Sequence, residues 1–325
     1  MILVRTPLRI SIGGGGSDLP SYYERFGGFF ISAAIDKHVY IGINKIFTKE
    51  YSIRYSSQER VTDPGKIVHR IVREAVKLHQ LGPVEIVSLA DIPAGTGLGS
   101  SGSFTVALLR AIYAYKREPV TMNSLAEEAC HIEMNLLNEP VGKQDQYIAA
   151  FGGITCFEID RGGQVEVSPL AISNRGLHDL EDHLLLFFTG YSRSASDLLA
   201  DQKSKSQSDD ADMINNLHFV VDLGRQIKKV LIAGDNAGFG RLMHEHWLHK
   251  RKRSAGMSND SINRWYDAAM ANGALGGKLV GAGGGGFLML YAEDISGVRD
   301  AMVNEGLDEV RFKFDFDGST VLVRE

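Results

Sequence analysis

The sequence predicts an α/β (α+β) protein built from two domains, and three observations support this prediction. The chain has 325 residues, about twice the length of a domain of roughly 150 residues. Apolar residues alternate with polar ones in several short segments and recur at helical spacing in others. A stretch rich in turn formers over 160–182 separates two such series. We therefore expect one domain over residues 1–175 and a second over 176–325.

Strand and helix patterns alternate through the first half of the chain. Val39, Ile41 and Ile43 share one face of a half-buried strand, whereas later segments repeat every three or four residues. Ser124 and Glu127 match a capping box at the start of a helix. By these patterns we expect strands over 1–12, 29–47, 84–89 and 154–159, and helices over 66–81, 104–115 and 124–137.

The second half begins with an apolar strand and continues mostly as helices. The tract over 204–212 is polar and predicts a loop or an exposed helix start. The remaining pattern predicts a strand over 184–188, helices over 213–233, 237–248 and 261–272, and strands at the end of the chain.

Composition excludes several classes of protein. The formal net charge is −5 and the pI is about 6.1, so the chain lacks the basic field expected of a nucleic-acid-binding protein. No apolar run approaches the ~20 residues that cross a bilayer, and the first residues do not resemble a signal peptide. Cys130 and Cys156 show no metal or disulfide spacing. We expect a cytoplasmic protein with reduced thiols that binds neither nucleic acid nor membrane.

Three clusters of glycine stand out, over residues 13–16, 93–102 and 276–286. The second lies between a predicted strand and a predicted helix, where free backbone N–H groups and the helix dipole favour a phosphate anion. Gly95, Gly97 and Gly99 leave the backbone open, and a hydroxyl of Ser100 or Ser101 can reach a Mg²⁺ ion shared with the phosphates. The alternative is an ordinary capped helix after a glycine turn. The residues alone do not favour the phosphate-binding loop over this alternative.

Two common phosphate-binding loops are excluded. Gly277-Lys278 is followed by Leu279, so the chain has no Walker A loop. Gly281, Gly283 and Gly286 have the spacing of a dinucleotide-binding loop, but a strand pattern follows them where that loop requires a helix.

Two carboxylates are candidates for chemistry. Asp145 lies in a predicted polar turn, where a charge on Arg9 or Lys143 would keep it ionised and able to accept a proton. The alternative is a surface aspartate that caps the next helix. Glu133 lies at the edge of the apolar stripe of the helix over 124–137, a position that is usually solvated.

Taken in order, the three clusters resemble the motifs of the GHMP kinase superfamily. The segments over 6–18, 93–101 and 278–287 match its first, second and third motifs, of which the second reads P-x-x-x-G-L-G-S-S. The resemblance implies two α/β domains, an N-terminal one like ribosomal protein S5 domain 2 and a C-terminal ferredoxin-like one. ATP and the acceptor would bind between them.

The resemblance also implies roles for individual residues. Asp145 would activate the acceptor hydroxyl, and Arg9 would keep this aspartate charged and approach the γ-phosphate. Ser101 and Glu133 would hold Mg²⁺. The cradle for the ATP phosphates would comprise Pro93, Gly95, Gly97, Leu98, Gly99, Ser100 and Ser101.

Within the superfamily, the segments over 10–20 and 141–147 look most like bacterial D-glycero-D-manno-heptose 7-phosphate kinases, which phosphorylate the anomeric hydroxyl of a sugar phosphate. The acceptor would contact Gly15, Gly16, Ser17, Asp18, Gln144, Tyr191, Arg193 and Gly284. Its phosphate requires a cationic pocket, for which Arg193 or the run over 250–253 is a candidate, although that run also fits a solvated helix end. His244, His246 and His249 lack a carboxylate or cysteine partner for zinc and are expected at the surface.

Two other functions remain open at this point. One is the same chemistry on another acceptor, such as a hexose or an isoprenoid alcohol. The other is a regulator that binds sugar and ATP without transferring phosphate. A homodimer is also among the expectations.

Overall fold

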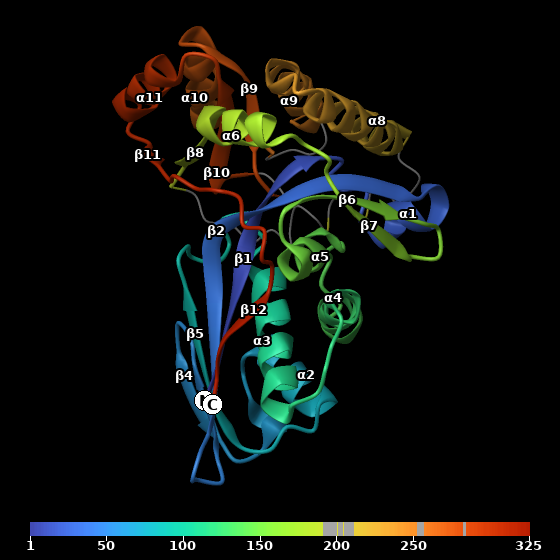
Figure 1. The fold of residues 1–325 in the computed structure, drawn as a ribbon, viewed down its shortest axis with the longest axis vertical. Coiled ribbons are helices and arrows are strands. Elements are labelled where there is room, and N and C mark those ends of the chain that lie inside the picture. The colour runs from blue at the N-terminus through green and yellow to red at the C-terminus, as the bar shows by residue number, and fades with distance from the viewer. Residues whose placement is uncertain (191–199, 201–203, 205–210, 252–256, 282–283) are drawn as a thin grey trace.

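The computed structural model describes residues 1–190, 200, 204, 211–251, 257–281 and 284–325. In this part of the chain the strands form two sheets, one of eight strands and one of four, with helices packed against both (Figure 1). This arrangement confirms the predicted mixed α/β fold.

The larger sheet is centred on one long strand, β2, which spans Gly28–Lys45. Its first part pairs with β6, its second part with β5, and β1 runs along most of its length. The register of β1 against β2 shifts between Pro7 and Leu8, which lets the long strand bend between its two sets of partners. The other strands of this sheet are β1 (Ile2–Gly13), β3 (Tyr51–Arg54), β4 (Gln58–Val61), β5 (Val84–Ala90), β6 (Ile154–Ile159), β7 (Val165–Pro169) and β12 (Thr320–Arg324).

Helices α2 to α5 lie together beside the larger sheet (Figure 1). Helix α2 is shorter than the helix predicted over 66–81, because a 3-10 turn over Pro64–Lys66 precedes it and His69 is its N-cap. The capping-box prediction is wrong: Thr121 is the N-cap of α4, and its side chain accepts a hydrogen bond from the Ser124 N–H. The helices of this half are α1 (Pro20–Phe26), α2 (Arg70–Leu78), α3 (Ser100–Lys116), α4 (Met122–Cys130) and α5 (Gln144–Phe151).

Helix α4 continues into a π-helical turn over His131–Leu136. A π turn contains more residues than an α turn and therefore rotates the side chains that follow it. As a result Glu133 is 1% exposed whereas Leu136 is 44% exposed. The prediction that Glu133 lies at a solvated edge is therefore wrong.

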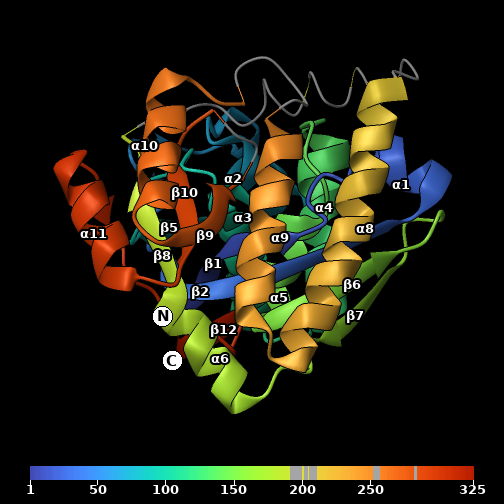
Figure 2. The ribbon, with the colours of Figure 1, turned by 90° about the horizontal axis from the view of Figure 1, so that it is seen from above.

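The smaller sheet has the order β11-β8-β10-β9 and is antiparallel throughout. Helices α9, α10 and α11 pack on it, and α8 runs beside α9 and packs on β1 and β2 (Figure 2). These elements are α6 (Asn174–His183), β8 (Leu184–Phe188), α8 (Ala211–Ala233), α9 (Asn236–Lys250), α10 (Asp260–Ala271), β9 (Ala274–Leu279), β10 (Phe287–Ala292), α11 (Ile295–Asn304) and β11 (Asp308–Glu309).

Two segments differ from the sequence prediction in this half. The stretch over 160–182 is not only turns, because it holds β7 and α6. Helix α11 lies within the end of the chain that was expected to be strands. Most of the polar tract over 204–212 lies outside the described residues.

The chain returns to the larger sheet at its end. Strand β12 pairs with β1, so Thr320–Arg324 completes a sheet that begins at Ile2. Before this pairing, the Asp315 carboxylate accepts a hydrogen bond from Nε2 of His38 at 2.8 Å, and the Phe314 N–H donates to Glu181. The boundary near residue 175 remains a prediction, and the residues after 319 belong to the first sheet.

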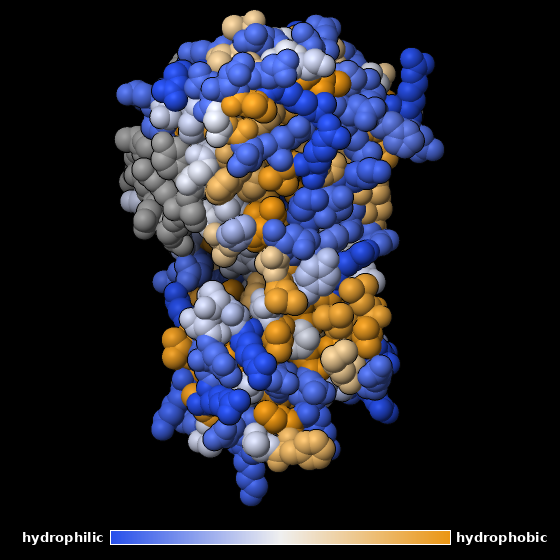
Figure 3. Space-filling view, turned by 90° about the vertical axis from the view of Figure 1, so that its left-hand side faces the viewer, coloured by the Kyte–Doolittle hydropathy of each residue, from blue (hydrophilic) through white to orange (hydrophobic). Residues whose placement is uncertain are grey.

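The surface is polar over most of the upper half of the face in Figure 3, and hydrophobic side chains gather in the lower half. Among the helices of the described residues, none combines the length and apolarity needed to span a bilayer.

Candidate active site

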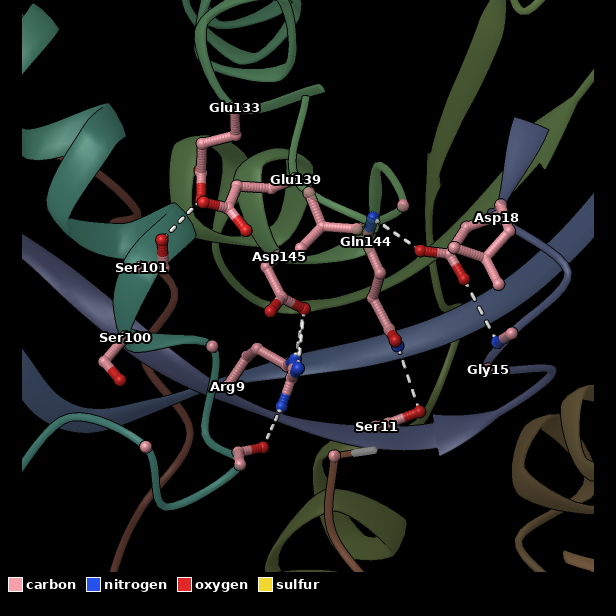
Figure 4. Close-up of a pocket in the computed structure, with 18 of the residues that line it drawn as sticks. Arg9, Ser11, Gly15, Asp18, Ser100, Ser101, Glu133, Glu139, Gln144 and Asp145 are labelled. Carbon is pink, nitrogen blue, oxygen red and sulfur yellow. Dashed lines mark hydrogen bonds and ion pairs between the residues drawn. The ribbon is translucent and has the colours of Figure 1, made fainter. Parts of the chain in front are cut away.

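A cavity of about 440 Å³ lies between the two halves of the molecule. Its walls come from β1 and the loop after it, the start of α3, the π turn, the start of α5, and the second-half elements α9 and β9. Figure 4 shows that Arg9, Asp18, Ser101, Glu133, Gln144 and Asp145 surround one common space. Residues far apart in sequence are therefore brought together around one cavity.

The start of α3 has the features of an anion site. Its N-cap is Gly99 in the left-handed conformation, with φ of +76°, and no side chain caps the helix. The caps of α4, α9, α10 and α11 are by contrast side-chain oxygens. Because a helix start carries unpaired N–H groups and partial positive charge, the first turn of α3 can bind phosphate oxygens.

The second and third glycine clusters pack backbone against backbone. Gly97 has φ of +84°, and a Cβ atom there would lie 2.6 Å from the Val280 carbonyl oxygen. Arg9 donates from Nη1 to the Gly97 carbonyl, and its backbone N–H donates to Leu98 at 3.0 Å. The loop conformation is thus fixed by both halves of the protein.

We expect Gly97→Ala to lower the free energy of unfolding by about 2 kcal/mol, because an L-residue is strained at this φ and the new methyl group meets Val280. ATP affinity should fall as the loop shifts. Thermal melts and nucleotide titration check both effects. Gly82→Ala is the matched control, since a Cβ there meets nothing within 4 Å; equal melting and equal ATP affinity in the two variants would contradict the expectation.

Ser101 and Glu133 form a direct pair on one wall of the cavity. The Ser101 hydroxyl donates a short hydrogen bond to Oε2 of Glu133, and the Gln146 amide donates to Oε1 at 3.0 Å. Burial raises the pKa of Glu133, although both hydrogen bonds act in the opposite direction, and the nearby Asp145 charge adds to the rise. A cation beside Glu133 would offset the cost of burying its ionised form.

These residues fit a magnesium ion. Mg²⁺ is usually held by one or two carboxylates together with substrate phosphates and water, and Glu133 with the Ser101 hydroxyl supplies such a partial set next to the start of α3. The Oε1 atom of Gln146 is buried without a hydrogen-bond partner among the described residues, so it can accept a bond from water on the ion. Among the described residues, no group of three or more His, Cys, Asp or Glu side chains could hold a metal without substrate.

Asp145 and Arg9 form an ion pair at the centre of the cavity. Nε of Arg9 donates to Oδ1 of Asp145 at 2.7 Å, and Nη2 lies 2.6 Å from the same oxygen. Asp145 is in the first turn of α5, so the prediction of a polar turn is wrong. Lys143, the other candidate partner, instead binds Glu127 at 2.7 Å.

A second polar group lies beside this pair. Oδ2 of Asp18 accepts a hydrogen bond from the Gln144 N–H at 3.1 Å, and Oδ1 accepts one from the Gly16 N–H at 3.0 Å. The Gln144 side chain donates to Ser11 at 3.0 Å. Burial raises the pKa of Asp18, its hydrogen bond from Gln144 lowers it, and the charge of Asp145 raises it again. This group can hold the hydroxyls of a sugar.

Some residues predicted for the site do not line the cavity. Ser17 is fully buried, and its hydroxyl donates to the Gly14 and Phe29 carbonyls. Leu98 is in the core, and Pro93 and Gly284 are absent from the lining. Tyr191 and Arg193 lie outside the described residues.

Sequence reasoning missed part of the second-half wall. His246, expected at the surface, is 3% exposed and lines the cavity together with Lys250 and Lys278. From the run over 250–253, Lys250 is buried and Arg251 is exposed. His69 and Arg70, at the start of α2, also line the cavity. Helical periodicity could have placed His246 and Lys250 on one face, four residues apart.

Comparison with known proteins agrees with this geometry. The chain matches the models of the GHMP kinases N terminal domain over residues 66–153 and of the GHMP kinases C terminal domain over 227–308. It is 30% identical to a D-glycero-alpha-D-manno-heptose 7-phosphate kinase of Campylobacter jejuni, over 90% of this chain and 89% of that protein.

Solved structures share the fold. A D-glycero-D-manno-heptose 1-phosphate kinase from Bacteroides thetaiotaomicron superposes with a TM-score of 0.81 and 26% identity, covering 99% of each chain. A Streptococcus pneumoniae phosphomevalonate kinase in complex with phosphomevalonate and AMPPNP gives a TM-score of 0.78 at 15% identity, over 97% of this chain and 100% of that one. The predicted resemblance is therefore confirmed, and the chain belongs to the GHMP kinase family.

Proposed function

We propose that this protein is an ATP-dependent sugar kinase that phosphorylates the anomeric hydroxyl of D-glycero-D-manno-heptose 7-phosphate and yields the 1,7-bisphosphate. The observation that carries the proposal is the ion pair of Asp145 and Arg9, which faces the same cavity as the uncapped start of α3. Transfer of a phosphoryl group to a hydroxyl requires a proton acceptor and a phosphate-binding loop in the same cavity.

The described residues divide the work of this reaction. The backbone of residues 95–101 holds the ATP phosphates, and Asp18 with Gln144 orients the sugar. Asp145 accepts the proton of the attacking hydroxyl as the oxygen bonds to the γ-phosphorus and the bond to the β-phosphate oxygen breaks. The ion pair with Arg9 holds the Asp145 carboxylate in position toward the hydroxyl, and ADP leaves.

Ser101 and Glu133 would hold Mg²⁺. The ion, when bound, neutralises charge on the transferred phosphoryl group.

The choice of acceptor is supported by the relatives. One is named a heptose 7-phosphate kinase and another a heptose 1-phosphate kinase. Both names describe a heptose that already carries one phosphate, and they differ in its position.

An acceptor panel tests the proposal. The panel contains heptose 7-phosphate, heptose 1-phosphate, the unphosphorylated heptose, galactose, fucose and mevalonate, each with ATP and Mg²⁺, with ADP release as the assay and phosphorus NMR of the product. We expect heptose 7-phosphate to give the bisphosphate with a kcat/KM about 100-fold above that of the hexoses. ADP release with heptose 1-phosphate alone would mean that the enzyme phosphorylates the other end of the sugar. Absence of ADP release with every acceptor would favour a regulator that binds sugar and ATP without transferring phosphate.

The reaction uses ATP and a sugar phosphate, which supports the cytoplasm as its location. No role for nucleic acid or membrane is proposed. The homodimer remains a prediction.

A further inference from the structure

Helix α5 carries the candidate base Asp145 in its first turn, and contacts behind the helix hold it in place. The helix is only 8 residues long, and no side chain caps its start. A helix this short has little stability of its own in water, so contacts with its neighbours determine its orientation. Helix α5 packs against α3 and α4 (Figure 1). A contact that fixes its first turn therefore also fixes Asp145.

Lys143 is the N-cap residue of α5 and is 6% exposed. Its ammonium group donates to Oε1 and Oε2 of Glu127 on α4, at 2.7 and 3.0 Å, and to the Gly163 carbonyl at 2.7 Å. Gly163 lies in the turn between β6 and β7. Because an ammonium group has three protons to donate, these bonds can use all of them. Lys143 thus ties the start of α5 both to α4 and to this turn.

A second side chain of α5 meets the same carboxylate. The Tyr147 hydroxyl donates a short hydrogen bond to Oε1 of Glu127. Burial and this hydrogen bond both raise the pKa of Tyr147, so its hydroxyl keeps its proton. Lys143 and Tyr147 are four positions apart and therefore lie on one face of the helix. Asp145 is two positions from each, so its side chain leaves the opposite face and lines the cavity.

The cavity side of α5 depends on the same orientation. The Gln144 N–H donates to Asp18 at 3.1 Å, and the Gln146 side chain donates to Glu133 at 3.0 Å. Asp145 lies between these two residues in the chain. The angle of α5 therefore sets the position of the base relative to both the polar group for the sugar and the carboxylate for the metal.

We propose that Lys143 is a positioning residue for phosphoryl transfer: by binding Glu127 and Gly163 behind α5, it sets the orientation in which Asp145 meets the acceptor hydroxyl. This inference rests on the proposed function. Lys143 is not part of the cavity lining, so it acts through α5 and not through contact with substrate. Because a displacement of about 1 Å at a reacting group can cost about 100-fold in rate, loss of this anchor should lower kcat.

Lys143→Met tests the assignment, with heptose 7-phosphate as the acceptor. The variant keeps an unbranched side chain and loses the charge. The Glu127 side chain is 41% exposed, so its charge stays hydrated and the variant should fold. At a temperature where circular dichroism shows it folded, we expect kcat to fall by about 10–100-fold and the KM for ATP to stay within about threefold. The KM for ATP is spared because the bonds of Lys143 reach Glu127 and Gly163 and not the phosphate loop.

A double-mutant cycle with Glu127→Gln separates positioning from a general loss of stability. This change keeps the size of the side chain and removes the charge that binds Lys143. If the two residues act through one link, the double variant should lose no more kcat than Lys143→Met alone. Additive losses would overturn the assignment. If Lys143→Met does not fold, Glu127→Gln alone carries the test, with an expected fall in kcat of about 10-fold at an unchanged KM for ATP.

Lys116→Met is the matched control. Lys116 is the last residue of α3, forms an ion pair with Glu118 at 3.0 Å and lies outside the cavity lining. The control variant should therefore have wild-type kcat and wild-type KM for ATP.

The inference and the proposed function fail differently. If the wild-type enzyme phosphorylates the sugar and folded Lys143→Met keeps its kcat within about threefold, the anchor only supports the fold and the kinase function stands. A rise in the KM for ATP that parallels the fall in kcat would mean that the whole cavity has loosened, and would also overturn the inference. If the wild-type enzyme releases ADP with no acceptor of the panel, the proposed function fails and the role of Lys143 fails with it.

Discussion

Asp145→Asn is expected to lower kcat by about 10²–10⁴-fold, the usual range for losing a general base. The asparagine side-chain oxygen can still accept the hydrogen bond from Nε of Arg9, which in the wild type is 2.7 Å long. The shape of the cavity is therefore retained while the proton acceptor is removed. Steady-state ADP release measures kcat, and calorimetric titration should give an ATP affinity within twofold of wild type.

The control for this variant is Asp222→Asn, which removes an exposed carboxylate from α8. It should have wild-type kinetics. Near-normal turnover in Asp145→Asn would remove Asp145 from proton transfer and leave positioning by the loop as the main source of rate.

Glu133→Gln is expected to reduce Mg²⁺-dependent turnover by at least about 100-fold, because the charge that would hold the ion is lost. The same change should leave the ligand-free protein as stable as wild type or more so. Burial raises the folded-state pKa of Glu133, so the unfolded chain releases this proton first, and the carboxyl group costs stability as pH rises from its ordinary value toward the raised one. The glutamine side chain does not titrate, so the variant does not carry this pH-dependent cost.

Thermal melts across pH 4–8 test the second part of this prediction. The melting temperature of Glu133→Gln relative to wild type should increase with pH above about 4.5 and then level off. Glu245→Gln, on the exposed face of α9, should show no such trend. A variant that melts lower than wild type at pH 8, or that keeps its Mg²⁺ response, would count against Glu133 as the metal ligand.

Helices and strands with strong periodicity could be predicted from the sequence. The predictions were wrong where a local irregularity changed the period. Strand β6 was placed residue for residue, and β5 and α10 to within one residue at each end, because apolar spacing dictates them. Glu133 was misplaced because a π turn cannot be read from a 3.6-residue pattern. Helices α5 and α6 are short, at 8 and 10 residues, and their patterns are too brief to separate from turns.

For the site, the glycine loop could be predicted because only glycine permits its backbone. The partner of Asp145 could be reduced to two candidates, Arg9 and Lys143, but only the three-dimensional structure chooses between them. Among the second-half residues that line the cavity, Lys250 belongs to the run over 250–253 that the sequence analysis considered for a cationic pocket. His246 and Lys278 were not predicted to line the cavity, because they meet across 32 positions of sequence and each has an ordinary neighbourhood in the chain.

The return of β12 to the first sheet has a mechanical consequence. The second half departs through α6 and rejoins through residues 310–319, where Asp315 bonds to His38 of the first sheet and the Phe314 N–H bonds to Glu181 on α6. The outgoing helix and the returning segment are therefore tied to each other and to the first sheet at one place, so the two connections between the halves form a double tether rather than a single linker.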